Sequence, residues 1–213
     1  PPRSPHFNGL AEAAVKSAKW HLRKMLHTAR LTFDELSTVT AEVEAILNSR
    51  PLTPMSNDPN DLQPLTAGHF LIGGPMTAIE DRNVMTGPKT KIWYKMMSMR
   101  NEFWHRWSKE YLAGLQSKIK WKSEKDNIQI GALVIIQEDN IAPLHWRMGR
   151  VTRLFKDDQG KVRVVELKTS VVKIPNSPNG KTRINNMVAD TKIVRRAIHR
   201  ICPLPVATDI ISA

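Results

Sequence analysis

The sequence predicts an α+β protein in which helices occupy roughly the first 125 residues and short strands follow. Two observations support this division. Apolar residues recur every three or four positions in residues 8–30 and 91–120, which is the spacing of one helix face. After residue 127, runs rich in Val and Ile alternate with turn residues, as is typical of short antiparallel strands.

Residues 1–55 are expected to form two helices. Residues 8–30 place small and apolar side chains on one face and charged side chains on another. The second helix is predicted to begin at a capping box, in which the Thr32 hydroxyl caps the helix and Glu35 reaches back. It is predicted to end before Pro51, because the residue preceding a proline disfavours helical conformation.

Residues 56–90 are rich in Pro and Gly, which indicates an irregular connector. Residues 91–125 are predicted to form one long helix with an aromatic stripe. Such a stripe is more typical of a buried core than of stacking on nucleobases. Its members are Trp93, Met97, Trp104, Trp107, Tyr111 and Leu115.

Residues 126–205 are predicted to form a small barrel or curled sheet, because several short strands follow one another closely. Residues 157–160 (DDQG) are predicted to form a hairpin turn. Residues 175–190 indicate a flexible loop, and residues 206–213 a frayed tail. The expected strands are residues 128–130, 133–136, 148–155, 162–168, 171–174 and 193–198.

The net charge of +12 lies entirely in the second part of the chain. Residues 1–89 hold 9 basic and 9 acidic side chains, whereas residues 90–213 hold 23 basic and 11 acidic ones. This excess predicts a partner that is a polyanion such as DNA. No apolar stretch is long enough to span a membrane, and the single Cys202 excludes an internal disulfide. The expected localisation is the nucleus and cytoplasm.

A set of motifs runs in order along nearly the whole chain. Together they resemble the end of the integrase core of LTR retrotransposons of the BEL/Pao type, followed by that family's basic C-terminal region. The matching segments are residues 5–12 (PHFNGLAE), 14–17, 42–53 (EVEAILNSRPLT), 65–73, 103–112, 120–121, 131–134, 138–140, 146, 149–151, 160, 162–165 and 202–205.

The resemblance implies helices left from a ribonuclease H-like core, a long linker helix and a small SH3-like β-barrel. It implies that Glu12 is the third of three carboxylates that hold two Mg²⁺ ions in the complete core. The two Asp residues are expected upstream of Pro1, so this chain alone is expected to be inactive, although its parent is a DNA strand-transferase. Spacing alone favours an ordinary ion pair between Glu12 and Lys16, and it is the resemblance that favours the catalytic role.

The resemblance also implies that basic residues on the helix of Glu12 hold the DNA ends of the element. These are Lys16 and Lys19, which helical periodicity places on the face of Glu12. Arg23 extends the same stripe and is a further candidate, with a solvated charged face as its alternative. Further phosphate contacts are expected in the basic barrel, where plain surface charge is the alternative for each residue. These candidates are Arg147, Arg150, Arg153, Lys156, Lys161, Arg163, Lys192, Arg195, Arg196 and Arg200.

The expected function is DNA integration as a fragment of a retrotransposon integrase. The expected partners are DNA, the remainder of the core and further copies of the chain. The alternative is a domesticated or degenerate protein that binds nucleic acid without catalysis. A methyl-lysine reader is disfavoured, because the barrel region offers only Trp146 and Phe155 for an aromatic cage. His21 and His27 have no zinc-ligand spacing.

Overall fold

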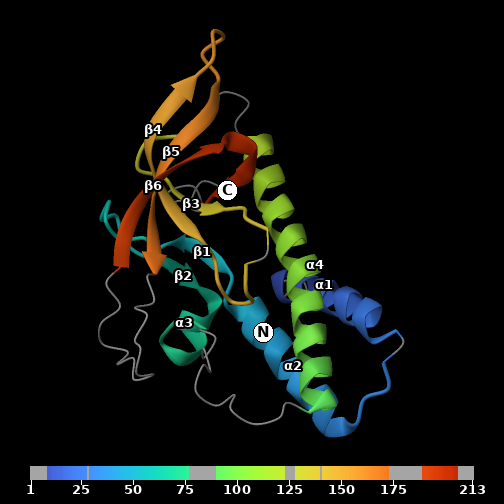
Figure 1. The fold of residues 1–213 in the computed structure, drawn as a ribbon. Helices are drawn as coiled ribbons and strands as arrows, with labels where there is room; N and C mark the ends of the chain where they lie inside the picture. The colour runs from blue at the N-terminus through green and yellow to red at the C-terminus, as the bar shows by residue number, and fades with distance from the viewer. Residues whose placement is uncertain are drawn as a thin grey trace. The chain divides into compact units, whose positions relative to one another are not determined.

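The computed structural model describes residues 9–27, 29–76, 90–122, 128–139, 141–172 and 189–205, and it confirms a mixed helix and sheet protein (Figure 1). The chain divides into two compact units. The helical unit contains Pro1–Arg50, Ala67–Ala113 and Ala142–His145, and the sheet unit contains Pro51–Thr66, Gly114–Ile141 and Trp146–Ala213. In the part that the structure describes, no helix is both long and apolar enough to cross a membrane.

The helical unit is built from α1 (Gly9–Leu26), α2 (Phe33–Asn48), α3 (Ala67–Ile72) and most of α4 (Lys91–Lys122). The predicted capping box is confirmed at the start of α2. The Glu35 amide donates to Thr32 Oγ1 at 3.3 Å, and the Thr32 amide donates to Glu35 Oε2 at 2.9 Å. The helix ends at Asn48, before Pro51 as predicted.

The core of the helical unit lies between the apolar faces of its helices. The predicted core role of Trp104 and Trp107 is confirmed, whereas Trp93 and Met97 are only half-buried. The reason is that the buried face of α4 contains Met96 rather than Met97, and it also contains Phe103, which the predicted stripe leaves out. The buried apolar residues of α2 and α4 are Val39, Val43, Ile46, Met96, Met99, Phe103, Trp104, Trp107 and Leu112.

Part of the expected irregular connector is regular. Within it, strand β2 (Pro64–Thr66) is followed directly by α3, and β2 pairs antiparallel with β1 (Pro51–Pro54), which lies just before the connector. Three prolines lie at the ends of these two strands, where a missing backbone donor is tolerated. Residues 77–89 of the connector lie outside the described residues.

Five antiparallel strands form the main sheet, in the order β6-β5-β4-β3-β7 (Figure 1). They are β3 (Leu133–Ile136), β4 (Met148–Lys156), β5 (Val162–Val172), β6 (Ala189–Ala197) and β7 (Ile201–Pro203). A 3₁₀ turn, η3 (Ile198–Arg200), joins the last two. Within the described strands, β6 and β7 are edges of this order, and no closed barrel is seen.

Four predicted strands are confirmed and two are wrong. Residues 128–130 are not a strand, and residues 171–172 extend β5 instead of starting a new strand. The sequence did not predict β7, because three residues that include a proline carry no periodic pattern. Residues 175–188 of the predicted flexible loop and the predicted frayed tail at residues 206–213 lie outside the described residues. The last two residues of that predicted loop, 189 and 190, belong to β6 instead.

The interior of the sheet unit is aliphatic and tightly packed. Its buried cluster contains Val134, Ile136, Val151, Val162, Val165, Leu167 and Ile201. Gly149 lets β4 pack closely against Ile136, since a Cβ there would lie 3.0 Å from Ile136 Cδ1 and the Ile136 side chain would have to shift. The predicted hairpin turn between β4 and β5 is confirmed, and Gly160 adopts a φ of 76° in it. This hairpin fixes which side chains of β4 and β5 lie opposite one another.

Candidate nucleic-acid interface

The charged face of α1 points to solvent. The side chains of Glu12, Lys16, Lys19 and Arg23 are all exposed. No group of three or more His, Cys, Asp or Glu side chains among the described residues is arranged to hold a metal ion. The metal role of Glu12 stays a prediction.

The opposite face of α1 carries a buried polar contact that the sequence did not predict. His21 is 1% exposed, and its Nε2 lies 2.9 Å from Glu110 Oε2 on α4. The Ser17 hydroxyl donates to Glu110 Oε1 at 3.1 Å, and the Phe103 ring packs edge-on against the imidazole. Glu110 lies 89 residues after His21 in the sequence, so no local pattern pairs them.

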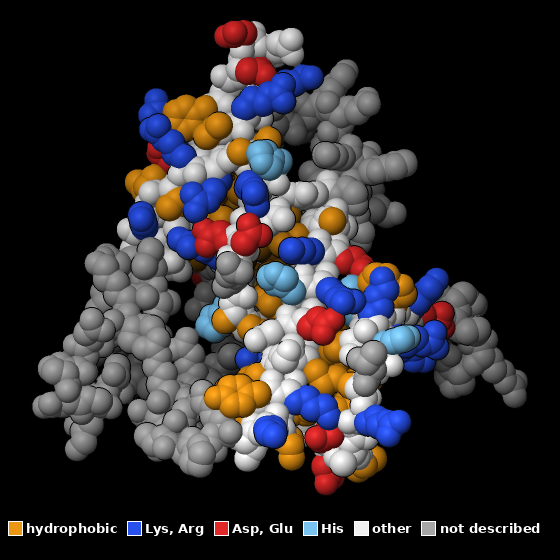
Figure 2. Space-filling model, turned by 45° about the vertical axis from the view of Figure 1, so that its right-hand side comes forward, with side chains coloured by type: hydrophobic (Ala, Val, Ile, Leu, Met, Phe, Trp, Pro, Cys, Tyr) orange, Lys and Arg blue, Asp and Glu red, His pale blue; other side chains and the backbone are white. Residues whose placement is uncertain are grey.

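The sheet unit carries the remaining candidate contacts. Figure 2 shows Lys and Arg side chains spread over one face of the molecule, with acidic side chains among them. Charge alone therefore does not identify the residues that can reach DNA. The contacts of each candidate decide this, and they divide the candidates into exposed, paired and buried groups.

An exposed group lies on one face of β4, β5 and β6. The register pairs Arg153 with Glu166 and Glu166 with Arg195, so these three side chains share a face, with Phe155 two residues beyond Arg153. The guanidinium carbons of Arg153 and Arg195 lie 5.2 Å and 4.9 Å from the centre of the Phe155 ring. We call Arg153, Phe155, Glu166 and Arg195 the outer-face cluster.

The outer-face cluster keeps its cations accessible. The Arg195 side chain is 66% exposed, and its Nε lies 3.3 Å from Glu166 Oε2. Such an exposed pair is weak, and a phosphate can compete for the guanidinium. Cation–π contact with one ring orders both guanidinium groups on the strands without neutralising them. The arrangement thus presents two ordered positive charges on a solvent-exposed surface.

The tip of the hairpin adds basic residues with mixed surroundings. Lys156, Lys161 and Arg163 are exposed. Arg163 Nε donates to Asp157 Oδ2 at 2.9 Å, and this hydrogen bond is the main reason why the pKa of Asp157 lies below its usual value. Backbone amides of residues 159 and 161 also donate to Asp157 Oδ1, so this carboxylate mainly orders the turn.

Arg150 is buried and braces the sheet unit internally. It is 7% exposed, Nη1 donates to the Gly131 carbonyl at 2.9 Å, and Nη2 donates to the Asp61 carbonyl at 2.6 Å. A guanidinium that is enclosed and engaged in this way is not available to a phosphate. We therefore remove Arg150 from the candidate DNA contacts.

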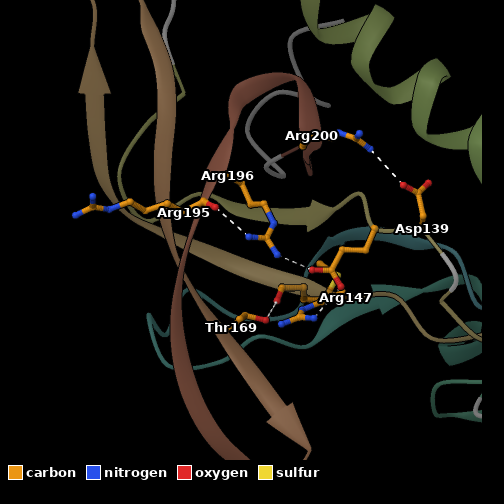
Figure 3. Close-up of polar contacts among 8 residues, drawn as sticks. Asp139, Arg147, Thr169, Arg195, Arg196 and Arg200 are labelled. Carbon is orange, nitrogen blue, oxygen red and sulfur yellow. Dashed lines mark hydrogen bonds and ion pairs between the residues drawn. The ribbon is translucent and has the colours of Figure 1, made fainter.

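Arg147 and Arg196 share one carboxylate. Arg147 Nη1 lies 2.7 Å from Glu138 Oε2, and Arg196 Nη2 lies 2.9 Å from Glu138 Oε1. Figure 3 shows Arg196 and its neighbour Arg195 pointing to opposite sides of β6, as alternation along a strand requires. We call Glu138, Arg147 and Arg196 the Glu138 node.

The Glu138 node also reports the shape of the sheet. It joins the end of β6 to the chain just after β3, although β5 and β4 stand between these strands in the hydrogen-bonding order. The sheet is therefore strongly curled. Beside the node, Arg200 Nη1 lies 3.7 Å from Asp139 Oδ2 (Figure 3).

Comparison with known proteins adds one match. Residues 91–176 match a family of unknown function (DUF5641). The match begins at the first residue of α4 and ends shortly after β5, so it includes Arg153 and Phe155 but not Arg195 on β6. No curated protein and no solved structure matches the chain.

Sequence reasoning missed three members of this interface. Phe155 had a weak signal, because it lies two residues after Arg153 in a predicted strand and so shares its face. No local pattern pairs Glu138 or Glu166 with an arginine, since their arginine partners are 9 to 58 residues away. Only the strand register brings these charges together.

Proposed function

We propose that the chain binds DNA through the exposed face of β4, β5 and β6, and that it acts in DNA integration as part of a retrotransposon integrase. The observation that carries the DNA-binding proposal is the outer-face cluster. It orders two arginines from different strands on an accessible surface, and Lys156 and Arg163 are further exposed cations on the hairpin of β4 and β5. Contacts of this kind bind the phosphates of DNA and do not distinguish one base sequence from another.

We further propose that the sheet is an SH3-like barrel. Its support is the strand order β6-β5-β4-β3-β7, the 3₁₀ turn between the last two strands and the curl that the Glu138 node implies. Small barrels of the SH3 type share this strand order and this turn. The integrase assignment itself rests on the sequence motifs.

For α1 and α2 we propose the C-terminal helices of a ribonuclease H-like core. The exposed stripe of Lys16, Lys19 and Arg23 supports a role in holding DNA ends beside Glu12. In a complete core, Glu12 would contribute one carboxylate to a Mg²⁺ site that polarises the scissile phosphate. Further copies of the chain are expected partners in such an assembly.

Salt-dependent DNA binding tests the proposal. The 213-residue chain should bind duplex DNA of unrelated sequences with similar affinity, and log K should fall linearly with log salt concentration. The double variant Arg153→Ala/Arg195→Ala removes two phosphate contacts, so the slope should fall by about 1.8. Because both side chains are exposed, the midpoint of urea unfolding should hardly change.

The matched control removes two exposed cations from the helical unit, with Arg106→Ala/Lys109→Ala. It lowers the net charge by the same amount but lies outside the proposed interface. The control should keep the wild-type slope. Equal loss of slope in both double variants, or a wild-type affinity that does not respond to salt, would contradict the proposal.

A further inference from the structure

The Glu138 node has the donor arrangement of an anion site. Two guanidinium groups, from the segment before β4 and from the end of β6, converge on the two oxygens of one carboxylate at 2.7 Å and 2.9 Å. The side chains of Arg147, Arg196 and Glu138 are 32%, 33% and 22% exposed. The site is thus neither sealed in the core nor fully solvated, and small anions can reach it.

A phosphate matches this arrangement as well as a carboxylate does. Guanidinium groups bind both through paired N–H donors, and two arginines on one phosphate are a common mode of backbone recognition. The neighbouring Arg200 is also held by an acidic side chain, Asp139. Residues 138 and 139 therefore supply the anions for three arginines of a chain that is otherwise strongly basic.

We propose that Arg147 and Arg196 form a phosphate-binding site that the Glu138 carboxylate occupies when no nucleic acid is bound. Glu138 then limits the affinity of the sheet unit for the DNA backbone, because a phosphate must displace it before the two arginines become available. This inference rests on the proposed DNA-binding function and assigns Glu138 the regulation of that binding.

The competing explanation is that Glu138 is only a brace. It does connect the end of β6 with the segments next to β3 and β4. A brace predicts that loss of the carboxylate lowers stability and leaves anion affinity unchanged. An internal competitor predicts that the same change raises the affinity for phosphate. The two explanations therefore differ in the sign of a measurable effect.

The test uses Glu138→Gln in the full chain, with Asp158→Asn as the matched control. Asp158 is exposed at the hairpin tip, so its substitution removes the same charge away from the Glu138 node. Inorganic phosphate is titrated while the Nε–Hε NMR signals of Arg147 and Arg196 are followed. In wild type, phosphate must break the two contacts of Glu138 with the arginines. If each contact is as strong as an exposed ion pair, its removal lowers the Kd for phosphate about threefold. Glu138→Gln removes both contacts and should therefore bind phosphate about tenfold more tightly than wild type.

The same variants are then measured with duplex DNA. In Glu138→Gln the slope of log K against log salt should steepen by about 0.9, since the freed site neutralises one more phosphate. The gain should disappear when Arg147→Gln and Arg196→Gln are added. Asp158→Asn should show neither change.

The outcomes separate this inference from the proposed function. Phosphate affinity that rises in Glu138→Gln and falls back with the arginine substitutions supports the site, even if the chain binds no DNA. An unchanged phosphate affinity, an equal gain in Asp158→Asn, or a gain that survives both arginine substitutions overturns it. If Glu138→Gln does not fold, saturable phosphate shifts of both arginine signals in wild type support the site, and their absence overturns it.

Discussion

Arg150 offers the sharpest test of how the structure divides the basic residues. Its guanidinium donates to the carbonyls of Gly131 and Asp61, at 2.9 Å and 2.6 Å, and is almost completely enclosed. Arg150→Ala removes both hydrogen bonds and leaves two carbonyl oxygens without this donor. The loop that contains Asp61 also loses its link to β4. The expected result is loss of stability with no direct loss of DNA contact.

The size of the effect follows from these two bonds. A hydrogen bond from a charged donor contributes about 1.5–3 kcal/mol. Water can reach part of the opened site, because Gly131 is exposed and Asp61 is half-buried, which reduces the loss. We expect the free energy of unfolding to fall by about 2–4 kcal/mol. For a chain of this size the midpoint of thermal unfolding should fall by about 4–16 °C.

Urea unfolding followed by tryptophan fluorescence measures the stability, and the salt dependence of DNA affinity measures the contacts. Arg153→Ala is the matched control, because Arg153 lies on the same strand and is exposed. Arg150→Ala should lower the unfolding midpoint and keep the wild-type salt slope. Arg153→Ala should keep the wild-type midpoint and reduce the salt slope. If Arg150→Ala kept the wild-type midpoint and reduced the slope as Arg153→Ala does, the burial argument would be refuted.

Three further predictions concern stability and reactivity. Thr32→Ala removes half of the capping box and should lower the free energy of unfolding by about 1 kcal/mol in urea titrations, with Thr38→Ala as a control inside α2. Burial raises the pKa of the Cys202 thiol to about 11, so the folded chain should react slowly with a thiol reagent at pH 8 and rapidly in urea. Because this pKa lies above the ordinary value of 9.0, the associated stabilisation is complete below pH 9 and is lost as pH rises toward 11. The Ser56 hydroxyl, the Gln63 amide and Arg150 hold the pKa of Asp61 below its usual 3.8. The ionised Asp61 carboxylate therefore stabilises the fold above pH 3.8, and this stabilisation is lost as pH falls through the lowered pKa. Asp61→Asn should make the free energy of unfolding depend less on pH in the acid range.

Each of these has a result that contradicts it. Equal destabilisation by Thr32→Ala and Thr38→Ala would show that the hydroxyl of Thr32 does not cap α2. Fast labelling of Cys202 in the folded chain would show that the β7 edge opens readily. An acid unfolding curve that is unchanged in Asp61→Asn would show that the contacts of this carboxylate do not stabilise the fold.

Several features follow from the sequence alone, because they depend on neighbours a few residues apart. The capping box of α2 needs only Thr32 and Glu35, and the end of that helix needs only Pro51. The turn at residues 157–160 and the strands on either side of it are predicted for the same reason. The uneven distribution of charge along the chain is likewise a property of the sequence. These features predict the secondary structure and a polyanionic partner.

The roles of individual charges were decided only by the tertiary structure. Arg150 and Arg153 lie three residues apart on β4 and look equivalent in the sequence. A register shift between Val151 and Arg153 leaves both on the same face of the sheet, but a segment 89 residues earlier in the chain covers only Arg150. Glu138 similarly acquires Arg196 from a strand 58 residues later. The burial of a charged side chain and the identity of its ion-pair partner depend on such distant contacts. Strand register and the folding of the chain create these contacts, and the local periodicity of the sequence does not predict them.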